Sequence, residues 1–198
     1  MHLAQLCNFQ AGFTARGRLE PMAHGGQLAL QLRDLSEGGV VDLGGLQRFD
    51  LGNLSDRYII QPGDVLFRTR GESSIAYLMP DGGHEPVLAL MPIIVLRPFR
   101  DLVLPEYLVW AINQPDAQRQ IDAEAQGASM RMIPKRALEQ VEIPVPSLKV
   151  QRLIVETSSL AAAEFALFQR LAANRLALAN HMLAAAAHGG AQPKGVRQ

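Results

Sequence analysis

The sequence has a single cysteine, and it lacks both an apolar run of membrane length and a secretory signal. One thiol, Cys7, cannot form an intramolecular disulfide, so an oxidising compartment is not indicated. No segment approaches the roughly 18 consecutive apolar residues that a membrane-spanning helix needs. The first residues, Met1–Gln5, carry neither the basic nor the apolar part of a signal peptide. We therefore expect a cytoplasmic protein that does not enter a membrane.

The sequence also has no net charge at neutral pH. The 19 Lys and Arg residues balance the 19 Asp and Glu residues, so the bulk attraction of a histone-like protein to a polyanion is not expected. The basic residues are 16 Arg and only 3 Lys, and Arg is the side chain suited to bidentate contacts with phosphates or guanine edges. Genomic base composition can produce the same excess of Arg. Hydrophobic residues make up 48% of the chain, which excludes general disorder.

Glycine and proline are absent from residues 147–188, although residues 1–146 hold 14 of the 17 glycines and 11 of the 12 prolines. A helix interior loses about 1 kcal/mol with each Gly and about 3 kcal/mol with each Pro. The same stretch is rich in Ala, Leu, Gln and Arg, which are strong helix formers. It therefore predicts one helix from Lys149 to about Ala187, roughly 55 Å long.

Residues suited to the ends of this helix flank it. Ser147 can cap the first turn, and Gly189–Gly190 can end the last one. The predicted organisation has three parts, namely a globular domain over 1–146, a long helix over 147–188 and a disordered tail over 189–198.

The predicted helix is apolar around most of its circumference. A leucine row comprises Leu153, Leu160, Leu167, Leu171, Leu178 and Met182. A phenylalanine row comprises Ile154, Ala161, Phe165, Phe168, Ala172, Leu176 and Leu183. A helix of this kind must be covered on most sides, and it is longer than the diameter of the preceding domain. We expect it to pair with a second copy as a coiled coil, through the five leucines of the first row and Phe168 of the second. A long core helix of one larger fold is the alternative.

The first 146 residues show the pattern of short strands and turns with a helical insert. Val65–Gly71 alternates as a strand does. Ser74–Met79 and Val87–Leu96 flank a Pro-Asp-Gly-Gly turn, which predicts a hairpin, and Pro92 predicts a bulge or an edge in the second of these runs. Two short helices are expected from Pro105 onward. The predicted fold class is α+β, a mixed β-rich domain followed by one long C-terminal helix.

No catalytic or cofactor-binding constellation is visible. The histidines are scattered and lack metal-ligand spacing with Cys or acidic residues. They are His2, His24, His84, His181 and His188. No phosphate-binding loop and no glycine fingerprint follows a strand and opens a helix. We therefore expect no metal, no cofactor and no catalytic activity, and a small hydrolase has no support beyond the ordinary supply of acids and histidines.

Basic residues gather at predicted turns and strand ends. Arg16 and Arg18 flank a glycine, Arg68 and Arg70 alternate on one predicted strand, and a third group precedes the closing segment Val141–Pro146. If these places converge, a protein of zero net charge can still present one basic face to a duplex. The same arginines can instead be surface charges paired with acidic neighbours such as Asp64.

Several segments, taken in order, resemble one half of the DNA-specificity subunit of type I restriction-modification systems. They are Leu3–Leu6 leading to Phe9–Thr14, Tyr58–Gly71 with its Pro-Gly-Asp turn, Ile94–Pro98 with Leu104–Leu108, and Gly127–Arg136 with Leu138–Leu148. Gln151 falls at a Gln typical of the family, whereas Val150 stands where Glu is usual. No segment is specific alone, but their order and spacing cover most of the chain.

The resemblance implies a target recognition domain followed by a long helix. The family's full-length subunit carries two such units, whose helices are antiparallel and act as a spacer, whereas this sequence holds one. It therefore implies a half-subunit that forms a homodimer, reads a split inverted-repeat site in double-stranded DNA, and docks methyltransferase (M) and possibly restriction (R) subunits. Catalysis would belong to those partners.

The resemblance carries over regions of DNA contact and no individual base-reading residue, because such residues differ with the target. The regions, called here the three basic segments, are Thr14–Arg18, Arg68–Gly71 and Ser129–Arg136. Within them we predict DNA contacts by Arg16, Arg68, Arg70, Arg131 and Lys135. The alternative function is a protein-interaction module in which the long helix recruits a partner, which zero net charge favours. Steep weakening of DNA binding by salt separates the first function from the second.

Overall fold

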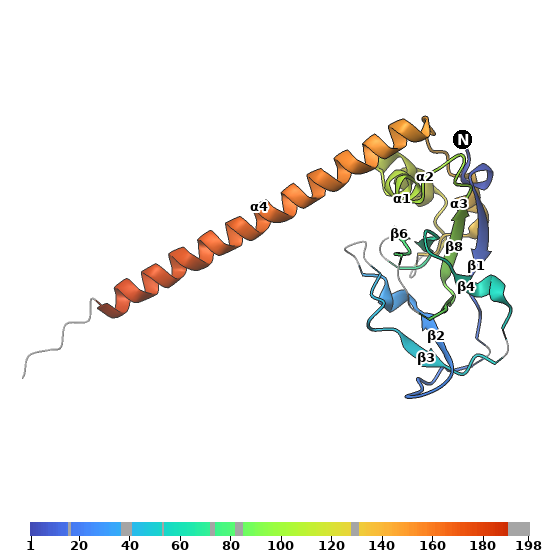
Figure 1. Cartoon of the computed structure of the whole chain (residues 1–198), viewed down its shortest axis with the longest axis horizontal. Coiled ribbons are helices and arrows are strands. Elements are labelled where there is room, and N and C mark those ends of the chain that lie inside the picture. The colour runs from blue at the N-terminus through green and yellow to red at the C-terminus, as the bar shows by residue number, and fades with distance from the viewer. Residues whose placement is uncertain are drawn as a thin grey trace, which may run out of the picture. The chain divides into compact units, whose positions relative to one another are not determined.

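The computed structural model describes residues 1–15, 17–36, 41–52, 54–71, 74–81, 85–127 and 131–189. The chain divides into two compact units, Met1–Val155 and Glu156–Gln198. The fold class expected from the sequence, α+β with one long C-terminal helix, is confirmed (Figure 1). The expected tail over 189–198 lies, apart from its first residue, outside the described residues.

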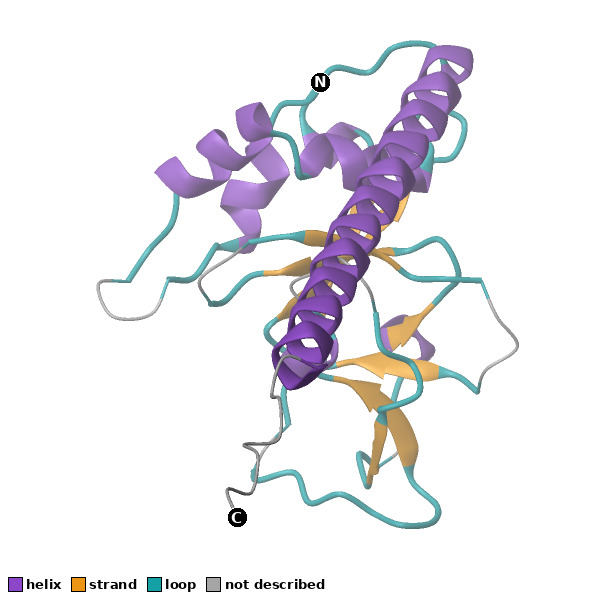
Figure 2. Cartoon of the chain, turned by 90° about the vertical axis from the view of Figure 1, so that its left-hand side faces the viewer, coloured by secondary structure: helices purple, strands orange, loops and turns teal. Residues whose placement is uncertain are grey.

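The first unit contains two four-stranded sheets (Figure 2). In the first sheet, every neighbouring pair is antiparallel. Its order is β1 (Cys7–Ala11), β8 (Ile93–Pro98), β5 (Val65–Arg68) and β6 (Ala76–Leu78). In the second sheet, β2 and β7 are parallel and the other pairs antiparallel. Its order is β3 (Gln47–Phe49), β2 (Gln27–Leu30), β7 (Val87–Ala89) and β4 (Ile59–Ile60).

Both faces of the two central strands of the first sheet, β5 and β8, are buried. Because successive side chains of a strand point to opposite faces, Val65 and Phe67 of β5 contribute to one apolar cluster and Leu66 to another. The first cluster also contains residues of the short helices, and the second contains residues of β2 and β7. Burial on both sides explains why β5 and β8 are apolar at consecutive positions rather than at alternate ones.

Helices gather at one end of this unit, beside β1 and β8, whereas β2 and β3 lie at the other end (Figure 1). The α-helices of this unit are α1 (Pro105–Ile112), α2 (Pro115–Ala123) and α3 (Lys135–Gln140), and α4 (Leu148–Gly189) begins here and continues through the second unit. Short 3-10 helices span Leu3–Gln5, Leu32–Asp34 and Asp56–Tyr58. Pro105 and Pro115 occupy first positions of α1 and α2, where the missing N–H costs no hydrogen bond. The long helix extends one residue before and two after the predicted limits.

The predicted hairpin is wrong. The run Val87–Leu96 is divided at Pro92 into β7 and β8, which belong to different sheets. β6 pairs with β5, and β7 pairs with β2 and β4. Pro lacks the N–H that a ladder requires, so one apolar run supplies strands to both sheets. Pro92 is therefore the point where the chain crosses between the sheets.

Gln151 anchors the first turn of α4 on the first unit. Its side chain is fully buried, and its Oε1 accepts from the N–H of Leu104 at 2.9 Å. Its Nε2 donates to the carbonyl oxygens of Leu102 at 3.0 Å and Pro146 at 2.8 Å. The amide thus satisfies two backbone groups next to the start of α1 and one just before α4, which gives a physical role to the Gln that the sequence shares with the family pattern.

Replacing Gln151 with Leu is expected to lower the free energy of unfolding by about 2–4 kcal/mol, because three backbone groups lose their partner in a buried place. Denaturant titration followed by the fluorescence of Trp110, the one tryptophan of the sequence, measures this change. The matched control Gln169→Leu alters an exposed glutamine of α4 and is expected to change stability by less than about 0.5 kcal/mol. Equal effects of the two variants would refute the anchoring role.

Candidate functional site

Two of the three basic segments lie side by side. Arg68 ends β5, and its Nε donates to the carbonyl oxygen of Arg70 at 3.1 Å. The N–H of Gly71 donates to the carbonyl oxygen of Arg131 at 3.3 Å, and Arg70 forms an isolated bridge with Met132. A Cβ at Gly71, whose φ is +118°, would lie 2.7 Å from Nη2 of Arg68. Glycine therefore lets the Arg68 guanidinium lie against this backbone.

The chain around Pro92 joins these segments to the first one. Thr69 Oγ1 donates to the carbonyl oxygen of Pro92 at 2.6 Å, and the N–H of Ile133 donates to the carbonyl oxygen of Thr69 at 2.8 Å. On the other side, the N–H of Met91 donates to the carbonyl oxygen of Phe13 at 3.0 Å. Phe13 directly precedes the first basic segment. The first and second basic segments therefore adjoin one loop between β7 and β8, and the third adjoins the second segment through Thr69.

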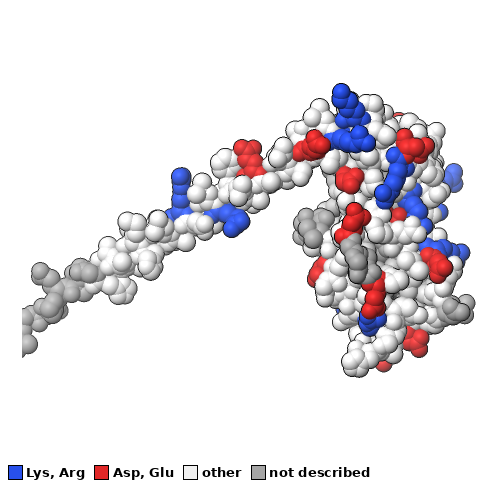
Figure 3. Space-filling view, in the orientation of Figure 1, with Lys and Arg blue, Asp and Glu red and all other residues white. Residues whose placement is uncertain are grey.

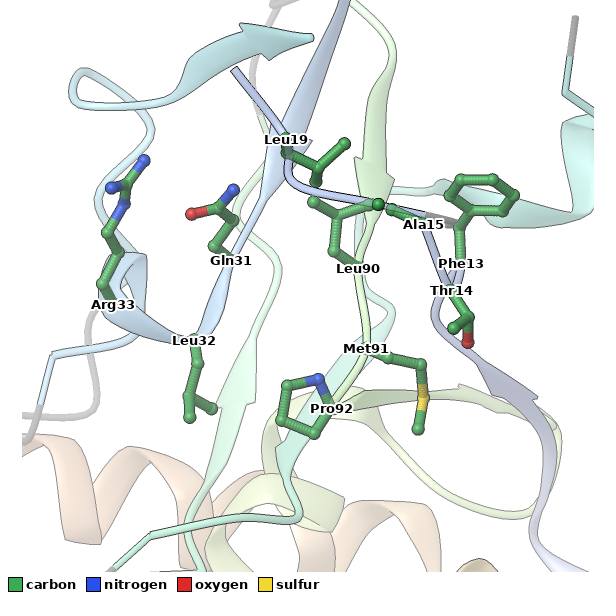
Figure 4. A pocket seen from close by; sticks show the side chains of 11 residues that line it. Phe13, Thr14, Ala15, Leu19, Gln31, Leu32, Arg33, Leu90, Met91 and Pro92 are labelled. Carbon is green, nitrogen blue, oxygen red and sulfur yellow. The ribbon is translucent and has the colours of Figure 1, made fainter. Parts of the chain in front are cut away.

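A groove of about 480 Å³ opens beside this loop (Figure 4). We call it the Phe13 groove. Its lining comes from three places in the chain, namely Phe13–Ala15 with Gly17 and Leu19, Gln31–Arg33, and Leu90–Pro92. A second hollow of about 490 Å³ lies beside the same first loop and includes Arg18 and Asp50. Both hollows therefore lie beside the segment that follows β1.

Polar groups line one side of the Phe13 groove. Gln31 and Arg33 flank it where β2 passes into the 3-10 helix (Figure 4). Arg33 donates from Nη2 to Oε1 of Gln47, and its Nε lies 3.8 Å from Oδ1 of Asp34. Oδ2 of Asp34 accepts from the N–H of Gln31 at 2.7 Å. Burial raises the pKa of Asp34 above its ordinary value. These contacts hold the guanidinium of Arg33 and the backbone of Gln31 at the rim of a half-apolar groove.

The remaining predicted contact residues have different surroundings. Arg131 forms an ion pair with Asp122 near the end of α2, and its side chain is 30% exposed. Lys135 opens α3, with Nζ 3.4 Å from Oε1 of Glu139 one helical turn later. Part of this positive charge is therefore balanced within the chain. Arg16, together with Ser129, lies outside the described residues.

Two features of the site differ from the sequence-based expectation. Arg68 and Arg70 do not share a strand, because β5 ends at Arg68; a hydrogen bond from the Arg68 side chain to the carbonyl oxygen of Arg70 holds the two residues together instead. Sequence reasoning also left Gln31 and Arg33 out of the predicted contacts. The one signal in the sequence is that the apolar run Leu28–Leu30 gives way to polar residues. This change places Arg33 at the end of a strand, but it does not show which residues lie opposite Arg33.

Among the described residues, no group of three or more His, Cys, Asp or Glu side chains is arranged to hold a metal ion. In the same part of the chain, no helix is both long enough and apolar enough for a membrane span.

Comparison with known proteins relates the chain to one kind of structure. No protein-family model matches the sequence, and no curated protein matches it. Among solved structures, the chain is similar to the type I restriction-modification S subunit of M. genitalium, with 17% identity over 81% of this chain and 37% of that chain and a TM-score of 0.56. It is similar to the HsdS subunit of Thermoanaerobacter tengcongensis, with 19% identity over 100% of this chain and 50% of that chain and a TM-score of 0.71.

A third similar chain comes from a structure that addresses complex assembly and conformational transition of the type I R-M system. It has 19% identity over 91% of this chain and 42% of that chain, with a TM-score of 0.66. At these identities the likeness is one of fold, and it confirms the resemblance noted in the sequence at that level. This chain spans between 37% and 50% of the length of the chains it matches.

Proposed function

We propose that the chain is a sequence-specific DNA-binding specificity subunit of a type I restriction-modification system, in half-length form. The observation that supports this most directly is the meeting of the three basic segments around the Met91–Pro92 loop, in a chain with the fold of known S subunits. The proposed contact residues are Arg16, Arg68, Arg70, Arg131 and Lys135, to which the geometry adds Gln31 and Arg33.

The residue types of this surface suit the reading of a duplex. Arg side chains bind guanine edges in a bidentate manner or neutralise phosphates, and Gln pairs in the same manner with adenine. Several of the arginines are already held by hydrogen bonds to backbone or side chains, which lowers the conformational entropy lost on binding. Because the net charge is zero, nonspecific attraction to DNA is weak and base contacts carry more of the total affinity.

The proposed assembly is a homodimer that pairs through α4. Side chains of both apolar rows are exposed along this helix, for example Leu160 at 72% and Phe168 at 60%. Their burial against a second copy would remove a large apolar surface from water. Two recognition domains then read a split inverted repeat, and methyltransferase and possibly restriction subunits dock on the pair. The chain itself works in the cytoplasm and supplies neither catalysis nor a cofactor.

Selection from a random duplex library tests this function. We expect the full chain to enrich a split, inverted-repeat sequence, and its affinity for that duplex to fall with salt by about 0.9 log units per neutralised phosphate for each log unit of salt. Sedimentation of the same sample gives its oligomeric state. Failure to enrich any sequence, together with a flat response to salt, would contradict DNA recognition.

The exposed apolar rows of α4 also favour a second candidate, a protein-interaction module in which this helix recruits a different protein. The two candidates differ in the role of the basic surface. A module of this kind would keep its partner affinity when Arg68 and Arg70 are replaced, since its contacts lie on the helix.

A further inference from the structure

Three side chains form a row across a small ladder beside the Met91–Pro92 loop. Met132 exchanges two backbone hydrogen bonds with Gln126, both at 2.9 Å, and forms an antiparallel bridge with Arg70 on its other side. Residues directly opposite each other in an antiparallel pair have their side chains on the same face. Arg70, Met132 and Gln126 therefore lie on one face in this order, and we call them the Met132 row.

The Met132 row lies on the solvent side of the ladder. All three of its members are exposed, Met132 at 45%. Their chain neighbours Thr69 and Ile133, whose side chains point to the opposite face, are 3% and 2% exposed. Ile133 belongs to the first apolar cluster. One face of the ladder is therefore held in the core, and the other presents the row.

A glycine follows each outer member of the row. Gly71 comes directly after Arg70 and has a φ of +118°, and Gly127 comes directly after Gln126 and has a φ of +101°. Such values favour glycine, and they turn the backbone out of the extended path. The chain therefore changes direction directly after both outer positions, so that the row lies at the rim of the ladder.

The three residue types match the major-groove edges of bases. Arg forms bidentate hydrogen bonds with guanine, Gln forms them with adenine, and an apolar side chain can contact the C5-methyl group of thymine. An exposed thioether gains nothing from a phosphate. Basic and acidic side chains are interspersed on the face of the first unit drawn in Figure 3, so contacts with particular bases must supplement attraction by charge.

The spacing of the row suits neighbouring base pairs. Opposite residues of an antiparallel ladder have Cα atoms about 4.5–5.5 Å apart, so the three members span about 10 Å. Stacked base pairs of B-DNA are about 3.4 Å apart, and the row therefore covers about three base-pair steps. Its side chains are long and unbranched, which lets them reach base edges from a ladder that lies across the mouth of the groove.

We propose that the Met132 row reads neighbouring base pairs of the target in the major groove. Arg70 contacts a guanine, Gln126 contacts an adenine, and Met132 contacts the methyl group of a thymine at a position between them. This inference rests on the proposed recognition of DNA and names the bases that this part of the surface prefers. It adds Met132 and Gln126 to the proposed contact residues.

Removing one methyl group from the DNA tests the role of Met132. Deoxyuridine in place of the thymine deletes the C5-methyl group and leaves the rest of the base pair unchanged. We expect the wild type to bind this duplex about fourfold more weakly, because a contact the size of one buried CH₂ group is lost. Met132→Ala, whose side chain is too short for the contact, should bind both duplexes equally, whereas Met132→Leu should keep the difference. Fluorescence anisotropy with labelled duplexes measures these affinities.

Repeating the library selection with variants tests the order of the row. We expect Gln126→Ala to lower the preference for adenine at one position, and Arg70→Ala the preference for guanine at another, each by about 5- to 150-fold. The two positions should lie within about three base-pair steps, with the thymine between them. The matched control Met22→Ala removes another exposed methionine, which forms a bridge with Arg48 beside the second sheet, and should leave the selected sequence unchanged.

The outcomes separate this inference from the proposed function. Equal binding of the thymine and deoxyuridine duplexes by the wild type overturns the contact of Met132, and this comparison needs no variant to fold. A selected sequence without these three bases in neighbouring positions, or preferences that the row variants leave unchanged, overturns the row while recognition of DNA stands. If the wild type enriches no sequence, the proposed function fails and the inference fails with it.

Discussion

Replacing Arg68 and Arg70 together with alanine is expected to weaken binding of the selected duplex by about 30- to 1,000-fold, that is, by about 2–4 kcal/mol. The reason is that each arginine that reads a base or neutralises a phosphate contributes roughly 1–3 kcal/mol. The two residues are adjacent in space, with Arg68 Nε on the carbonyl oxygen of Arg70. They belong to the surface around the Met91–Pro92 loop that we propose to contact DNA. Fluorescence anisotropy with a labelled duplex measures the change.

The salt dependence shows what kind of contact is lost. If both side chains neutralise phosphates, the slope of log affinity against log salt falls by about 1.8, and all sequences weaken alike. If they read guanine edges, the slope changes little and specificity relaxes at their positions. The matched control Arg119→Ala/Arg152→Ala removes two exposed arginines of α2 and α4 and should leave affinity unchanged. Unaltered binding by the Arg68/Arg70 variant would remove these residues from the proposed site.

The long helix could be predicted from the sequence because its evidence is local. Helix propensity acts residue by residue, and the absence of glycine and proline from residues 147–188 is visible without any knowledge of the fold. The observed helix, Leu148–Gly189, agrees with the prediction to within two residues at each end. The first position of α1 is likewise marked by a proline, whose local preference is strong.

The arrangement of the strands could not be predicted in the same way, because strand pairing is decided by distant parts of the chain. The run Val87–Leu96 looks like one strand, but Pro92 divides it between two sheets. The partners of its two halves, β2 and β5, are far away in the sequence. The helix α3 (Lys135–Gln140) was missed for another reason, since six residues are too few to show a period.

The candidate site, too, could be predicted from the sequence only in part. The clustering of basic residues at turns could be seen in the sequence, and it named Arg68, Arg70 and Arg131. Apart from the hydroxyl of Thr69, the contacts that bring these residues together run through backbone groups of Thr69 and Pro92, which carry no signal in residue type. Arg33 was not selected because its neighbour in the fold, Gln47, is distant in the chain.

Replacing Asp64 with alanine is expected to lower the free energy of unfolding by about 2–4 kcal/mol. Its side chain is 3% exposed and accepts from Nε of Arg97 at 3.0 Å, Nη2 of Arg97 at 2.8 Å and the N–H of Gln61 at 2.8 Å. The hydrogen bond to Asp64 raises the pKa of Arg97. Removing one partner of a buried ion pair costs about 3–5 kcal/mol. The loss expected here is smaller because the Arg97 side chain is 37% exposed, and water screens an exposed charge. Thermal or denaturant unfolding measures the loss.

The ion pair between Asp64 and Arg97 also links the two sheets. Arg97 lies on β8 of the first sheet and also donates to the carbonyl oxygen of Ile59, on β4 of the second, at 3.2 Å. Arg97→Met therefore removes the same link from the other side. If the pair acts as a unit, the double variant Asp64→Ala/Arg97→Met is less destabilised than the sum of the two single variants. Additive losses would mean that each residue acts alone, and the junction of the sheets would then depend on apolar contacts.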